Sequence, residues 1–239
     1  MVKINELIVN GKSTSQFPFP VFVEENDGFR LPKKKNSIIE TKYTTGGIKE
    51  TVNAWPPIEK SYVIYCPTAT LKDLRQVKLW AKDYGKLVAS DDPDVYYEIL
   101  DTDLSHSKLE PVSGYRIALT FTVQPFGFEH KVKTNTYNSG QVLVNATNAP
   151  MYPRVVINGT SNKQTSIAIG KQKIYIANIQ GKITIECKFL EQNVFDHNNA
   201  RANHVMRGDF FEILPDSKNN IQLGPGINSI DILERWCWL

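Results

Sequence analysis

The chain has 239 residues, of which 41% are hydrophobic, and its 28 basic and 25 acidic residues leave a formal net charge of +3. This length accommodates one or two domains with buried cores, and the balanced charge predicts no nucleic-acid partner, because nucleic acids select a concentrated basic surface. The sequence contains no run of about 18 apolar residues and no signal-peptide pattern, so we expect no membrane partner either.

The cysteine content also limits the class of protein. Cys66, Cys187 and Cys237 are widely spaced and form no C-x-x-C motif. An odd number of cysteines at such spacings predicts neither a disulfide framework nor a zinc site. We therefore expect a soluble protein that is made in a reducing cytoplasm.

Residues 1–65 have the patterns of β-structure. A short alternating strand in "INELIVNG" is followed by Asn10-Gly11, a pair that favours two-residue hairpin turns because both residues tolerate positive φ. "SIIETKYTTGGIKETVNAW" predicts a second hairpin with Gly46-Gly47 at its corner, and "SYVIYC" predicts a buried strand.

Residues 70–84 carry the clearest helix pattern. Thr70 is a favoured N-cap, Asp73 completes a capping-box pair, and Gly85 is a natural stop. One stripe is apolar and predicts docking on a sheet: Leu71, Leu74, Val77, Trp80 and Ala81. Another side is basic: Lys72, Arg75, Lys78 and Lys82.

The stretch "LVASDDPDVYYEIL" gathers carboxylates at Asp91, Asp92, Asp94 and Glu98. A turn, a weak cation site and a catalytic pair are the alternatives. An apolar strand precedes Asp91-Asp92-Pro93-Asp94 and an alternating one follows it, and both Asp and Pro favour turns. A calcium loop needs a central glycine, which is missing. We interpret the stretch as a structural corner between two strands.

The clearest strand pattern follows in "YRIALTFTVQPF", where Tyr115, Ile117, Leu119, Phe121 and Val123 point to one side. The pattern is lost in the polar segment 127–140, where we place a domain boundary, with a hinge over residues 130–137. The second half again has short strands broken by Asn, Gly and Pro, which predicts a β-sandwich without a helix. We therefore predict a mainly β protein with two domains. Residues 1–131 are expected to form a β-sandwich or barrel-like domain with the one docked helix, and residues 132–239 the β-sandwich.

A search for chemistry finds no recognised catalytic, metal-binding or cofactor-binding motif. His197 and His204 lie close in the sequence but match no metal-ligand spacing. "LGPGINSI" matches no phosphate-binding loop. Tryptophans can stack on sugars, but packing in a core or interface is their commoner role. We predict no catalytic residue, no metal and no cofactor.

The overall layout resembles the distal tail proteins of bacteriophages with long non-contractile tails. The resemblance rests on "FPFPVFVEE" in the first strands, on the helix with its acidic-proline corner in "LRQVKLWAKDYGKLVASDDPDVYYEIL", and on "GYRIALTFTVQPFG" before a polar hinge. It covers residues 1 to about 130. The second half is similar through "NAPMYPRVVINGT", "GDFFEILP" and "LGPGINSIDI".

The resemblance implies a structural role and no enzymatic activity. Proteins of this family form a ring of six at the distal end of the tail tube. The ring connects the tube to the tail-tip, tail-fibre or tail-lysin assembly. Their first domain builds the ring, and a galectin-like β-sandwich follows it. The implied partners are copies of the same chain, the tail tube protein, a tail-fibre or tail-associated lysin protein, and a receptor-binding protein. The implied location is the virion tail tip, after synthesis in the host cytoplasm.

The basic side of the predicted helix is a candidate ring interface. Lys72, Arg75, Lys78 and Lys82 would meet the acidic surface at Glu24, Glu25 and Asp27 of a neighbouring copy. The alternative is that these cations only keep the helix soluble, since exposed ion pairs contribute little.

Two other functions remain open at this point. The first is a carbohydrate-binding module that adheres to the host cell surface through the carboxy-terminal sandwich, which glycan binding by that part would reveal. The second is a glycosidase with Asp and Glu in a cleft, which would require turnover that one carboxylate substitution abolishes.

Overall fold

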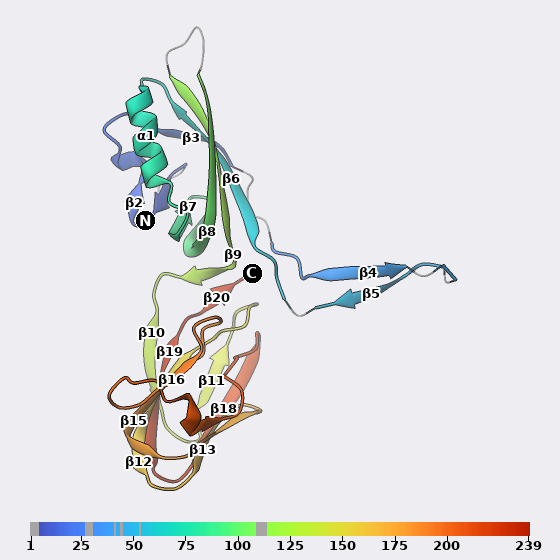
Figure 1. Cartoon of the computed structure of the whole chain (residues 1–239), viewed down its shortest axis with the longest axis vertical. Coiled ribbons are helices and arrows are strands. Elements are labelled where there is room, and N and C mark those ends of the chain that lie inside the picture. Colours follow the sequence, from blue (N-terminus) through green and yellow to red (C-terminus); the bar gives the residue numbers. More distant parts are fainter. Residues whose placement is uncertain (1–4, 27–30, 41, 44, 53, 109–113) are drawn as a thin grey trace. The chain divides into compact units, whose positions relative to one another are not determined.

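The computed structural model of the chain describes residues 5–26, 31–40, 42–43, 45–52, 54–108 and 114–239, without the side chains of residues 25, 26, 51, 107 and 108. It is mainly β, with one α-helix among these residues (Figure 1). This confirms the predicted fold class. None of the described helices has the length and apolar character needed to cross a membrane.

The chain divides into two compact units. The first comprises Met1–Gly127 with Leu239, and the second comprises Phe128–Trp238. Each unit has its own hydrophobic core.

The first unit is built on one large sheet with the strand order β2-β1-β7-β8-β9-β6-β3. The short strand β20, whose residues belong to the second unit, pairs with β9 outside this order. The strands are β1 (Leu7–Val9), β2 (Lys12–Ser13), β3 (Phe22–Asn26), β6 (Ile58–Cys66), β7 (Gly85–Ala89), β8 (Asp92–Lys108), β9 (Tyr115–Glu129) and β20 (Cys237–Trp238), and a 3-10 helix, η1 (Thr14–Gln16), follows β2.

Local sequence signals account for the hairpin and the central strand. Asn10 and Gly11 both adopt positive φ, at 50° and 80°, and form the predicted two-residue turn between Val9 and Lys12. In β9, alternate residues from Ile117 to Val123 are completely buried, as predicted. The opposite face of β9 remains polar, so this sheet has one apolar side.

The helix α1 (Leu71–Trp80) covers that apolar side of the sheet through Leu74, Val77 and Trp80. Its start is as predicted: the Thr70 side chain and backbone form a capping box with Asp73. These hydrogen bonds to Asp73 lower the pKa of its carboxyl. Capping therefore places the beginning of the helix, and the sheet sets its orientation.

The predicted end of the helix at residue 84 was wrong. Ala81 has φ −73° and ψ 75°, so the backbone leaves the helical region there. The Lys82 carbonyl accepts a hydrogen bond from the Thr102 hydroxyl on β8, at 2.7 Å, instead of continuing the helix. Lys82 consequently lies beyond α1, and the chain enters β7 at Gly85 with φ +100°.

A two-stranded ribbon stands apart from the large sheet. It consists of β4 (Asn36–Glu40) and β5 (Gly47–Thr51), which pair only with each other among the described strands (Figure 1). Its register runs from Asn36 opposite Thr51 to Glu40 opposite Gly47, so the predicted hairpin is present.

The second unit is a sandwich of two five-stranded sheets, as predicted for this half. Their orders are β10-β19-β12-β15-β16 and β11-β18-β13-β14-β17. The strands are β10 (Lys133–Tyr137), β11 (Val142–Asn145), β12 (Arg154–Ser161), β13 (Thr165–Ile169), β14 (Gln172–Ile176), β15 (Ile179–Glu186), β16 (Asn193–Phe195), β17 (Met206–Arg207), β18 (Ser217–Leu223) and β19 (Ile227–Glu234), and a 3-10 helix, η2 (Asn203–Val205), precedes β17.

The interpretation of residues 130–137 as a hinge was wrong for most of that segment. Lys133–Tyr137 forms β10, which pairs with β19 in continuous register. The strand is at the edge of its sheet and is largely exposed, so its side chains do not need to be apolar. Polar composition therefore marked an edge strand as well as a domain boundary.

Candidate assembly surfaces

The acidic corner is a turn, as predicted, but it lies earlier than expected. Ser90 and Asp91 form the turn between β7 and β8, with Ala89 opposite Asp92. Pro93 and Asp94 already belong to β8. The four acidic positions therefore do not share one loop.

Asp91 belongs to a buried polar cluster. The Lys60 ammonium donates to the Asp91 Oδ2 at 2.9 Å, and these side chains are only 5% and 7% exposed. The Tyr62 hydroxyl donates to the other oxygen of Asp91 at 3.0 Å. Tyr97 donates to Asp92 at 2.5 Å, and its ring lies 4.6 Å below the Lys60 ammonium. The cluster ties the turn to β6, two strands away from β8.

The cluster has the chemistry of a structural hydrogen-bond network. Burial, followed by the nearby Asp91 carboxylate, raises the pKa of the Tyr62 phenol, and burial with the hydrogen bond to Asp92 raises that of Tyr97. Both phenols therefore stay protonated and donate. Sequence reasoning missed Lys60. Its signal was a lysine on the apolar face of "IEKSYVIYC", in line with Tyr62 and Ile64.

The exposed side of α1 combines cations with leucines. Arg75 and Lys78 are exposed and lie on the same side as Leu71, at spacings of three and four residues. Leu71 was predicted to be buried but is 57% exposed, and Leu79 is 67% exposed. This side of the helix is therefore cationic with two exposed leucines among the charges.

The structure places the remaining candidate interface residues as follows. Lys72 is exposed on α1, whereas Lys82 is partly buried beyond its end. Glu24 accepts a hydrogen bond from Arg116 of its own chain at 2.9 Å. The side chain of Glu25 and all of Asp27 lie outside the described residues. The pairing of the helix cations with this acidic group stays a prediction.

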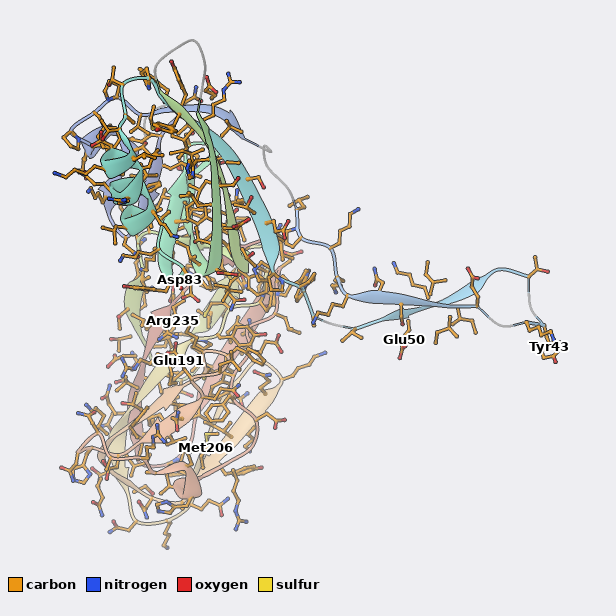
Figure 2. All side chains as sticks on the ribbon, turned by 45° about the horizontal axis from the view of Figure 1, so that its top comes forward. Tyr43, Glu50, Asp83, Glu191, Met206 and Arg235 are labelled. Carbon is orange, nitrogen blue, oxygen red and sulfur yellow. The ribbon has the colours of Figure 1, made fainter. Side chains whose placement is uncertain are left out.

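The β4–β5 ribbon exposes several large apolar side chains. Ile39 and Ile48 face each other across the strands and are 47% and 64% exposed. Ile38, on the opposite side of β4, is 71% exposed, so neither side of the ribbon is covered. Tyr43 lies at the turn end of the ribbon and is 91% exposed (Figure 2). Isolated two-stranded ribbons are only marginally stable, so a partner that covers these side chains would stabilise the ribbon.

The second unit contains a bidentate ion pair at one end of β15. Arg235 donates both terminal nitrogens to Glu186, at 2.6 and 2.7 Å. Burial would raise the pKa of Glu186, but the hydrogen bonds from Arg235 and from the Lys188 backbone lower it overall. The planar guanidinium fits the carboxylate in two places, so the pair fixes the end of β19 against β15.

The potential metal ligands and the thiols of the described residues are arranged as follows. In the described ranges, no three His, Cys, Asp or Glu side chains come together as metal ligands. The three cysteines are buried as free thiols. Burial raises the pKa of Cys66 to about 11 and those of Cys187 and Cys237 to about 12, so none is an activated nucleophile.

Comparisons with known proteins identify the architecture. The structure is similar to that of the SPP1 Dit protein, described as a paradigm of the hub adsorption apparatus in phages that infect Gram-positive bacteria. The TM-score is 0.78 over 99% of this chain and 100% of the other, at 12% identity. The chain has the fold of a phage adsorption-hub protein.

A second similar structure belongs to the phage P2 baseplate in its activated conformation with Ca. The TM-score is 0.53 over 98% of each chain, at 9% identity. No protein-family profile matches the sequence. No curated protein matches it either. The likeness is therefore one of fold along almost the whole chain, at very low sequence identity.

Proposed function

We propose that this protein is a structural component of a long non-contractile phage tail and forms a hexameric ring at the distal end of the tail tube. The likeness to the SPP1 Dit fold supports this assignment, since it covers 99% of this chain, and therefore both units, and 100% of the other chain. The role is structural and not enzymatic. The expected partners are other copies of the chain, the tail tube protein, and a tail-tip, tail-fibre or tail-associated lysin protein.

The uncovered β4–β5 ribbon is the observation that carries the ring proposal. A ring requires two different surfaces on each subunit, one of which contacts the other on the next copy. The ribbon supplies apolar side chains on both of its sides and unpaired strand edges. The exposed side of α1, with Leu71 and Leu79 among cations, is the candidate for the second surface.

The mass of the full-length protein in solution tests this proposal. Light scattering across a concentration series should give a species of six times the 27.1 kDa chain mass. A mass that stays at 27.1 kDa at every concentration, with and without purified tail tube protein as a template, would contradict a ring. Another closed stoichiometry would keep the ring and change only the number of subunits.

A further inference from the structure

One sheet of the second unit has an outer face with only positive charges. None of the strands β11, β18, β13, β14 and β17 contains an Asp or Glu. Lys173, Arg207 and Lys218 are exposed on these strands, and Lys171 is exposed in the turn between β13 and β14. We call these four residues the cationic face. Within the described part of the chain, none of the four forms an ion pair with a carboxylate.

The register shows that the cations follow one another across the sheet. Arg207 lies opposite Tyr175, and Lys173 is two residues before Tyr175. Lys173 and Arg207 are therefore diagonal neighbours, about 7–8 Å apart at their Cα atoms. Toward the opposite edge of the sheet, Lys218 of β18 pairs with Val144 of the edge strand β11. The face thus presents a series of charges and not a single clustered pocket.

The other sheet of the sandwich does not have this property. There, Asp231 accepts hydrogen bonds from Thr136 and Asn158, and Glu186 pairs with Arg235. The excess of positive charge is thus specific to one face. The segment between β17 and β18 contains three acidic residues, Asp209, Glu212 and Asp216, and the Glu212 backbone amide donates to Gln172 of β14 at 3.0 Å.

We propose that the cationic face binds a linear phosphodiester polymer without bases, of the glycerol phosphate type, on the bacterial surface. Spaced cations on an open face match the repeated charges of such a polymer, and no rigid pocket is needed. Tyr175 is 41% exposed, but the Lys173 ammonium lies 5.2 Å from its ring centroid. The ring is therefore engaged by a cation, whereas sites for single-stranded nucleic acid offer free aromatic faces for stacking.

This inference rests on the proposed function, because a tail-tip position brings the face close to the cell surface. It adds an anchoring role to a ring component. Polymer binding is an equilibrium property of the second unit, so it can be measured on the full-length protein whether or not a ring forms.

Binding of synthetic poly(glycerol phosphate) to the full-length protein at low salt tests the proposal. The double variant Lys173→Glu/Arg207→Glu should bind at least about tenfold more weakly, and the dependence of the affinity on salt should become shallower, because fewer phosphates are neutralised. The matched control Lys163→Glu/Lys182→Glu makes the same change in net charge away from this face and should bind within about twofold of the wild type.

Each contrary outcome overturns the assignment. Equal losses in both double variants would show a non-specific effect of net charge. Equal or tighter binding of a thymidine oligonucleotide of the same charge would assign the face to nucleic acid. No binding by the wild-type protein would remove the site. If the polymer binds but no ring forms, the proposed function fails alone, and if rings form without polymer binding, only this inference fails.

Discussion

Lys60 of β6 and Asp91 of the β7–β8 turn, 31 residues apart in the sequence, form a buried ion pair with an N–O distance of 2.9 Å. Asp91→Asn leaves the buried Lys60 charge without its hydrogen-bonded carboxylate. We expect this substitution to lower the free energy of unfolding of the first unit by about 3 kcal/mol. Urea unfolding, with hydrogen exchange of the β6 amides to assign the transition, measures the effect.

Two controls make this prediction specific. Asp94→Asn removes an exposed carboxylate three residues away and should change the stability by less than about 0.5 kcal/mol. Lys60→Met added to Asp91→Asn should recover part of the loss, because no charge is then buried alone. Equal effects of Asp91→Asn and Asp94→Asn would show that the pair does not brace the turn.

The Glu186–Arg235 pair predicts a pH dependence of the second unit. The pKa of Glu186 is lower in the folded protein than its ordinary value, so its contribution to stability is fully present above about pH 4.3, the usual glutamate pKa, and is lost as the pH falls through the lowered value. Glu186→Gln should reduce the stability at pH 7 by about 2 kcal/mol. Urea unfolding of both proteins from pH 7 to pH 3 should show a smaller decline for the variant, and parallel curves would refute the linkage.

The three thiols should be unreactive in the folded protein. Only the thiolate reacts with iodoacetamide, and burial both raises the thiol pKa values and blocks access. Mass spectrometry after treatment at pH 8 should detect no label in the native protein and three labels in urea. Rapid stoichiometric labelling without denaturant would mean that at least one of these cysteines is accessible.

Variants of the ribbon should separate assembly from folding. Ile39→Asp/Ile48→Lys replaces a facing apolar pair by opposite charges, which keeps the strands attractive to each other. We expect the ring to dissociate to single chains, while the melting temperature of the chain stays unchanged because both positions are exposed. Ser37→Asp/Glu50→Lys, another facing pair on the ribbon, is the control and should still assemble. If both variants still form rings, the ribbon is not the ring interface, and the exposed side of α1 is the next surface to substitute.

Local signals predicted much of this fold. The Asn10-Gly11 turn, the Thr70 cap and the alternation in β9 each depend on the chemistry of a few neighbouring residues. The end of α1 could not be predicted in this way, because the hydrogen bond from Thr102 to the Lys82 carbonyl comes from a distant strand. Leu71 followed the apolar stripe in the sequence, but it is 57% exposed at the first position of α1 and is not part of the core cluster.

The candidate surfaces were harder to predict than the fold. The ribbon has the same alternation of residues as a strand that joins a sheet, and only the structure shows that β4 and β5 pair with no other described strand. Lys60 is an isolated polar residue in an apolar pattern until Asp91 is brought beside it. The cationic face arises because antiparallel pairing aligns lysines and an arginine that are far apart in the sequence.

Immunogold electron microscopy of phage particles that carry this chain tests the central claim most directly. An antibody raised against the purified protein should label intact particles at the end of the tail that is distal to the head. Particles in which the chain bears Ile39→Asp/Ile48→Lys provide the matched control and should lose both the label and the tail tip. Labelling of the head, or purified infectious particles that contain none of this protein, would contradict the assignment to the tail tip.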